Sequence, residues 1–153
     1  MKKFVLGLFI MTLSFNSFSQ TCEERESKML SVMGSLSAGF LYNTYGLMGS
    51  IADGFGHNAY NAATTTDLMT AQAKLSDNMV GLLEKIVNEN AFKDEKDKDY
   101  MNSCIAIIKG LKIQAELFID FIKDNQSQKT LDAYNAQRDK NWKDLSKLMG
   151  IKG

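Results

Sequence analysis

His57 and the two cysteines are the residues of this chain best suited to carry chemistry. His57 is the only histidine, so one chain cannot assemble a cluster of His ligands around a metal, and the Glu-x-x-His pairs of di-iron bundles are absent. A Ser-His-Asp triad would have to use His57, which lies in a glycine-rich turn without a G-x-S-x-G elbow. We therefore expect His57 to be a loop residue that is exposed or caps a helix.

Other chemical motifs are incomplete in the sequence. Gly54-x-Gly56 lacks the third glycine and the preceding strand of a dinucleotide phosphate loop. The charged run from Lys93 to Asp99 lacks the regular spacing of a calcium loop, and we expect it to form a solvated turn. A haem held by His57 and a methionine would fit a helical bundle, but methionines at helical spacing are more typical of a core. We expect no catalytic site, no metal and no cofactor.

Cys22 and Cys104 are the only cysteines, and no CxxC redox pair or CxxCH haem attachment occurs. In an oxidising compartment an even pair usually forms one disulfide. Joining Cys22 to Cys104 would close a loop of about 80 residues and stabilise the chain by about 4–5 kcal/mol in the chain-entropy model. The alternative is two unpaired, buried thiols.

Export is indicated by the first 19 residues, which are ordered like a secretory signal peptide. Lys2 and Lys3 precede an uncharged apolar run from Phe4 to Leu13, and Ser17-Phe18-Ser19 supplies a small-x-small cleavage site. The apolar run is too short to span a bilayer as a helix. A lipoprotein signal that ends at Cys22 fits less well, because Ser19-Gln20-Thr21 lacks the usual aliphatic and small residues. We expect a periplasmic or secreted protein.

The remaining residues, 20–153, are expected to form a single all-α domain. Without Lys2 and Lys3, 16 basic residues face 18 acidic ones, for a net charge of −2, which argues against binding to nucleic acid. No proline occurs in the chain, and no ring therefore interrupts a helix. We expect an antiparallel bundle of four helices. A three-helix arrangement with a broken second helix is the alternative.

Four stretches have helical periodicity. The first opens at Thr21 with a capping box and ends near Asp53–Gly56; the second starts between Asn58 and Thr64, with a capping signal at Thr64–Asp67. The third follows the charged run and ends near Asp124, and the fourth runs from Ser127 to Met149 with Gly150 as its stop. In the first stretch the residues expected to face inward are Met29, Val32 or Met33, Leu36, Phe40, Leu47 and Ile51. In the second they are Met69, Ala73, Ser76, Val80, Leu83 and Val87, and this stripe is widened by Leu68, Leu75, Met79, Leu82 and Ile86. In the third they are Met101, Cys104 or Ile105, Ile108, Leu111, Ala115, Phe118 and Ile122, and in the fourth Leu131, Tyr134, Trp142, Leu145 and Leu148.

An unusual feature is the stretch from Met29 to Ala52, which carries no charged residue on any side. Surface helices normally carry charges on the outer face. The stretch also contains small-xxx-small pairs, which let helices approach closely, and two tyrosines, a residue type enriched at interfaces. Three interpretations fit: a central buried helix, an interface for self-association or for a partner, and insertion into a membrane. The interface residues would be Gly34, Ala38, Tyr42, Tyr45, Gly46 and Gly49.

The sequence thus predicts an exported helical bundle that acts by binding a protein or a second copy of itself, and not by catalysis. A carrier that holds a small apolar ligand or haem between its helices is one alternative. A membrane-active bundle is another.

Overall fold

The computed structural model describes residues 22–89, 91–124 and 126–151, and in these residues it contains four α-helices and no strand. They are α2 (Cys22–Gly56), α3 (Ala62–Asn88), α4 (Glu95–Lys123) and α5 (Gln128–Met149). The predicted all-α helical bundle is therefore confirmed. Because α3 is continuous, the alternative with a broken second helix is wrong. The expected signal peptide (residues 1–19) and the capping residue Thr21 lie outside the described residues.

The chain divides into two compact units after Gly34. In the first unit the described residues, 22–34, form the beginning of α2. The second unit starts at Ser35 and contains the rest of α2 together with α3, α4 and α5. All packing discussed below lies within the second unit.

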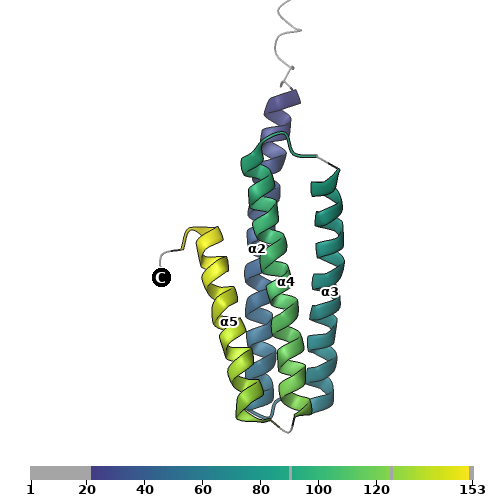
Figure 1. Cartoon of the computed structure of the whole chain (residues 1–153), viewed down its shortest axis with the longest axis vertical. Helices are drawn as coiled ribbons and strands as arrows, with labels where there is room; N and C mark the ends of the chain where they lie inside the picture. Colours follow the sequence, from purple (N-terminus) through teal and green to yellow (C-terminus); the bar gives the residue numbers. More distant parts are fainter. Residues whose placement is uncertain (1–21, 90, 125, 152–153) are drawn as a thin grey trace, which may run out of the picture. The chain divides into compact units, whose positions relative to one another are not determined.

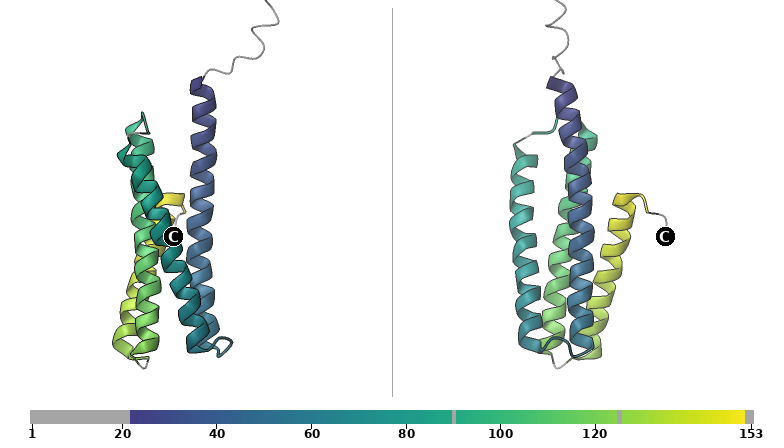
Figure 2. Two further views of the ribbon diagram at one scale, coloured as in Figure 1. Left: turned by 90° about the vertical axis from the view of Figure 1, so that its right-hand side faces the viewer. Right: turned by 180° about the vertical axis from the view of Figure 1, so that it is seen from behind.

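Helix α4 occupies the middle of the second unit. In Figure 1 it lies between α3 and α5, and it packs against both of them. The Ser35–Gly56 part of α2 also contacts it, because the ring of Phe55 meets Phe118 and Phe121 edge to face at centroid distances of 5.9 and 6.4 Å. In the views of Figure 2, α3 starts beside the end of α2 and finishes beside the start of α4.

Short polar side chains define where the helices begin. The Asn61 side chain accepts a hydrogen bond from the backbone N–H of Thr64 at 2.8 Å, so Asn61 is the N-cap of α3 and the predicted capping signal at Thr64–Asp67 is wrong. Asp94 accepts from the N–H of Lys96 at 2.9 Å and caps α4. Helix α4 thus includes most of the charged run that was predicted to be a turn. Acidic residues at its first turn complement the positive end of the helix dipole.

At both ends of α5 the structure agrees with the sequence prediction. The Ser127 side chain accepts from the N–H of Thr130, and Gly150 closes the helix in the left-handed conformation with φ 67°. A residue with a Cβ would be strained at this φ, which is why glycine is the usual residue there.

The core contains the inward residues predicted for the second and third stretches. The α4 seam is buried along its length, and Ile122 is half-buried at its end. In α3 the predicted stripe is buried or half-buried, whereas two of the residues expected to widen it, Leu75 and Leu82, are exposed. The buried core residues of α3 and α4 are Met69, Val80, Met101, Cys104, Ile105, Ile107, Ile108, Leu111, Ala115, Phe118, Ile119 and Phe121.

The prediction of which residues form the inward face of α2 is mostly wrong. Its buried side is formed by Leu41, Thr44, Met48 and Ile51, of which only Ile51 was expected. In the second unit, Leu36 and Leu47 had been expected inside and are exposed; in the first unit, Met29, Val32 and Met33 are exposed as well. The physical reason is that α2 lacks charges over this stretch, so no polar side marks which apolar residues face water.

In α5 the predicted burial of Trp142 is also wrong. Trp142 is 39% exposed, and Asn141 is buried instead. The Trp142 ring covers the edge of α2, with its centroid 5.5 Å from the ring of Tyr45. The indole therefore packs at the margin of the core, while a polar residue takes the interior position beside it.

Asn141 is held at this interior position by a hydrogen-bond network between α4 and α5. Its Nδ2 donates to the Gly110 carbonyl oxygen at 2.9 Å and to Oε1 of Gln114 at 2.8 Å. Its Oδ1 accepts from Nε2 of Gln137 at 2.8 Å. Gly110 has no side chain, and this leaves the room that the Asn141 amide occupies. The network places α5 on α4 in one register, because each buried amide loses its partners if the helices slide.

We predict that Gly110→Ala destabilises the protein by about 1–3 kcal/mol, because the new methyl group overlaps the Asn141 amide and forces it off its partners. The matched control is Gly81→Ala in α3, where an added Cβ meets no atom within 4 Å. Removing a glycine from an open helical position should stabilise by up to about 1 kcal/mol. Urea unfolding of both variants measures the difference, and equal shifts would contradict the proposed role of the network.

Candidate interaction site

The outward side of α2 is the candidate interaction site. In the second unit this side carries Leu36, Tyr42 and Leu47, which are 68%, 47% and 48% exposed. Asn43 lies between them and is also exposed. No Asp, Glu, Lys or Arg occurs in α2 between Lys28 and Asp53. Large apolar side chains therefore face solvent on a helix side that carries no charge between Lys28 and Asp53, an arrangement typical of a surface that contacts a partner.

Three glycines inside α2 have no packing role among the described residues. A Cβ added at Gly39, Gly46 or Gly49 would meet no atom within 4 Å beyond the helix's own turn. Each glycine in a helix interior costs about 1 kcal/mol relative to alanine. By contrast, Gly54 and Gly110 lie against side chains that would clash with a Cβ. The contacts among the described residues thus account for Gly54 and Gly110, whereas they leave Gly39, Gly46 and Gly49 unaccounted for, like Gly81 in α3.

The six residues predicted for an interface lie on two sides of α2. Gly34 belongs to the first unit and is half-buried. Tyr42 is exposed, and Tyr45 is half-buried against Trp142 of the same chain. The remaining three are Ala38 and Gly49, which are half-buried, and Gly46, which is exposed. Both tyrosines contact the Trp142 ring, Tyr42 at a centroid distance of 6.4 Å and Tyr45 at 5.5 Å, while Tyr42 and Gly46 remain exposed.

Sequence reasoning missed Gly39, Asn43 and Leu47 as a surface set. Gly39 and Asn43 were not among the residues predicted for the interface, and Leu47 was expected inside. Their spacing of four residues was the available signal, because residues four apart form one ridge along a helix.

An apolar groove lies between α2, α3 and α4, with a volume of about 210 Å³. Its lining residues are Leu36, Ser37, Phe40, Leu41, Met79, Leu83, Cys104 and Ile108. Because most of this lining is apolar, the groove suits an apolar group better than a charged one.

The Cys104 thiol lines this groove and is free in the structure. Burial raises the pKa of the Cys104 thiol, and a hydrogen bond with Tyr100 lowers it by less. Burial and the neighbouring thiol together raise the pKa of Tyr100 to about 12. A thiol with a raised pKa is a poor nucleophile at neutral pH. The Cys22 side chain lies outside the described residues, so its disulfide with Cys104 remains a prediction.

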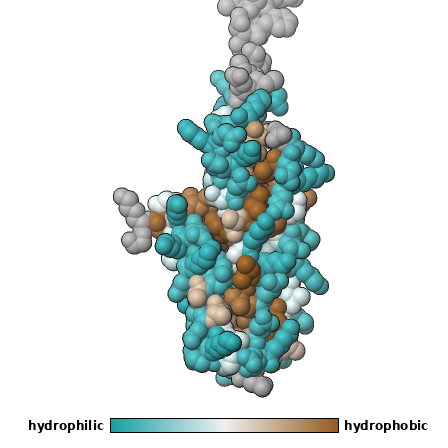
Figure 3. Space-filling view, viewed as in Figure 1, coloured by the Kyte–Doolittle hydropathy of each residue, from teal (hydrophilic) through white to brown (hydrophobic). Residues whose placement is uncertain are grey.

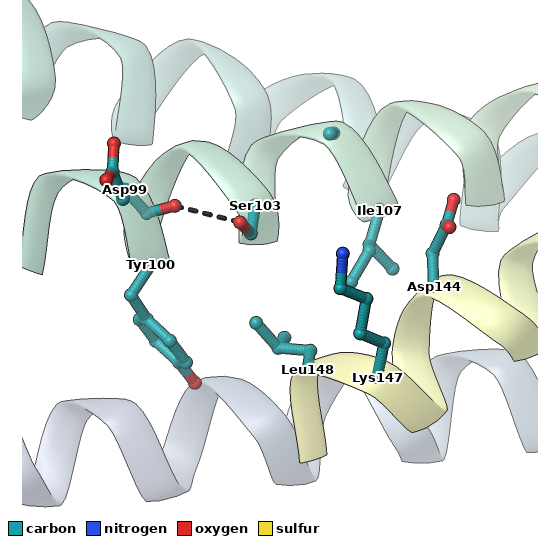
Figure 4. Close-up of a pocket in the computed structure, with 8 residues that line it drawn as sticks. Asp99, Tyr100, Ser103, Ile107, Asp144, Lys147 and Leu148 are labelled. Carbon is teal, nitrogen blue, oxygen red and sulfur yellow. Dashed lines mark hydrogen bonds between the residues drawn. The ribbon is translucent and has the colours of Figure 1, made fainter. Parts of the chain in front are cut away.

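A second groove, of about 490 Å³, separates α4 from the end of α5. Figure 4 shows Tyr100, Ile107 and Leu148 around it, with Asp144 and Lys147 at one margin. The Ser103 hydroxyl donates to the backbone carbonyl of Asp99 at 2.8 Å. The space-filling view in Figure 3 shows apolar atoms along the seams that flank α4 and hydrophilic side chains on the ridges. The lining of the groove between α4 and α5 thus combines apolar side chains with charges of both signs.

His57 lies in the loop after α2 and is exposed. Its Nδ1 is 2.8 Å from the carbonyl oxygen of Asp53, in the last turn of α2. Among the described residues no cluster of three or more His, Cys, Asp or Glu side chains has a geometry that would hold a metal ion. None of the helices in the described part of the chain combines the length and the apolar character that crossing a membrane requires.

Comparisons with protein-family models, with curated proteins and with solved structures find no match for this chain. The geometry of the helices is therefore the basis for assigning a function.

We predict that the folded state loses stability in alkaline solution. Burial raises the pKa of Cys104, Tyr100, Tyr134 and Tyr45 in the folded protein. The unfolded chain releases these protons first, from about pH 8.5 for a thiol and about pH 10 for a phenol. The stabilisation is complete below pH 8.5 and is lost as the pH rises toward 12.

Tyr100→Phe tests this account, since the variant lacks one of the four groups. Its free energy of unfolding should fall less steeply than that of the wild type between about pH 10, the ordinary pKa of tyrosine, and about pH 12, the pKa of Tyr100 in the folded protein. Urea unfolding at a series of pH values measures both slopes. Parallel slopes for the two proteins would show that Tyr100 has the same pKa in the folded and in the unfolded chain.

Proposed function

We propose that this chain is an exported helical-bundle protein that acts by binding a protein surface through the outward side of α2. The exposed, charge-free side of α2, with Leu36 and Leu47 in solvent, carries the proposal. Glycines that have no packing role in the chain support it, because a partner that approaches the α2 backbone closely would give them one. The order of residues 1–19 supports export.

Binding is favoured over catalysis by the groups that the structure leaves accessible. The one histidine is engaged with the backbone at the end of α2, and the buried thiol has a raised pKa. An apolar helix side contributes to association mainly by leaving water, at about 25 cal/mol per Å² buried. Leu36 and Leu47 would supply most of that area, and the glycines would let the partner approach the helix backbone.

We predict that a photo-crosslinking amino acid in place of Leu36 yields covalent adducts with a protein in the producing cell. The matched control replaces Glu116, an exposed residue of α4 on a charged helix side, and should yield few adducts. Mass spectrometry of the adducts identifies the partner. If neither position is crosslinked, or both are crosslinked to the same extent, the α2 side is not a specific binding surface.

A carrier of a small apolar ligand is the second candidate function, and the groove at Cys104 favours it. A cavity of about 210 Å³ is smaller than the 300–1,000 Å³ of typical drug-sized sites. It would hold a compact ring system or a section of an alkyl chain.

We predict, for this candidate, that an uncharged aromatic dye such as N-phenyl-1-naphthylamine gains fluorescence on binding the protein. Ser37→Phe places a ring in the groove and should abolish the gain. Ala106→Phe fills the other groove and should preserve it. Equal fluorescence in both variants would exclude the Cys104 groove as the dye site.

A further inference from the structure

Gly39, Asn43 and Leu47 form a row along the outward side of α2, spaced by four residues. Asn43 and Leu47 are exposed, and the position above Gly39 is empty to at least 4 Å. The row therefore consists of a hollow, a polar residue and an apolar projection. Rows at this spacing are the ridges that pack in the commonest class of helix crossing, at an angle of about 50°.

This row is complementary to itself when it is reversed. If two α2 helices cross antiparallel at Asn43, Leu47 of each copy lies opposite Gly39 of the other. The projection then enters the hollow at two symmetric places. The two Asn43 amides meet at the centre, where each Nδ2 can donate to the other Oδ1, and a central Asn pair of this kind fixes register in paired helices.

The absence of charge on this side allows a copy of the chain to pair with it. A two-fold interface brings a surface against itself, so a charge near the axis meets the same charge. The outward sides of α3, α4 and α5 carry exposed charges such as Lys74, Glu116 and Lys143. Only α2 offers an outward side in the described part of the chain that pairs with itself without repulsion near the axis.

We propose that α2 binds a second copy of this chain, antiparallel and centred on Asn43, with Leu47 of each copy seated over Gly39 of the other. This inference rests on the proposed function and names its partner. Flanking residues add contacts of the same kind, because Leu36 lies at the height of Ser50 of the other copy.

Sedimentation of the purified protein tests self-association directly. We expect a dimer for the wild type, and at least about 30-fold weaker association for Leu47→Glu, as for a side chain at the centre of an interface. Leu82→Glu in α3 is the matched control, since Leu82 is 59% exposed and lies outside the row. It should change association by less than about three-fold, within the range of a neutral position. Both replaced leucines are exposed, and circular dichroism should show equal helix content.

Cysteine crosslinking tests the orientation. In a Cys22→Ser background, Asn43→Cys should form a disulfide between copies upon oxidation, because residue 43 lies on the two-fold axis. Ser50→Cys should not, since antiparallel pairing holds the two copies of residue 50 about 20 Å apart at 1.5 Å per residue. Crosslinking at both positions would indicate parallel helices and overturn the proposal.

A wild-type protein that stays monomeric at about 100 µM, well above a micromolar Kd, would also overturn it. The proposed function survives that result if the crosslinker at Leu36 captures a different protein. Both fail if the protein is monomeric and Leu36 captures nothing.

Discussion

The contact between Asn141 and Gly110 fixes the position of α5 on α4. The combination of polar and apolar side chains in the interior between these helices depends on this contact. A buried amide needs hydrogen-bond partners, and one partner of Asn141 is the backbone carbonyl of Gly110 in α4. The Asn141 amide can reach this carbonyl because Gly110 has no side chain. Gln114 and Gln137 complete the network from the two helices. With α5 in this register, the Tyr134 ring packs 4.8 Å from that of Phe118, centroid to centroid. One glycine and one asparagine thus determine which side chains of α5 enter the core.

Two ion pairs link α3 to the other side of α4. Lys109 and Lys112 reach Glu84 and Asp77, each at 2.7 Å. These pairs lie at the surface, where each contributes less than about 1 kcal/mol. The apolar seam between the helices therefore supplies most of the stability, and the ion pairs favour one lateral placement of α3. The two junctions of α4 differ in kind, since a buried polar network fixes α5 and apolar packing fixes α3.

Sequence patterns were sufficient where charge and apolar residues alternate, and they failed where the charge is missing. The bounds of α5 were predicted to within one residue, because Ser127 and Gly150 are caps with a direct physical role. The buried face of α2 was predicted incorrectly, since the sequence of Leu36 and Leu47 is equally apolar whether these residues lie in a core or in solvent. Asn141 was missed because its burial depends on the Gly110 carbonyl, which lies on a different helix. Of the candidate site, the charge-free stretch was visible in the sequence, and the row through Asn43 required the helix to be oriented first.

The composition of α2 has a thermodynamic consequence for the whole protein. Gly39, Gly46 and Gly49 together lower its helix propensity by about 3 kcal/mol relative to alanine, and exposed Leu36 and Leu47 gain little from folding. Helix α2 therefore depends on its inner side, where Leu41 and Met48 are fully buried, for its attachment to the core. A partner on the outer side would bury the two leucines and fill the hollows above the glycines, and would offset part of that deficit. Binding and folding of α2 are then thermodynamically linked, since anything that binds only the folded helix stabilises it.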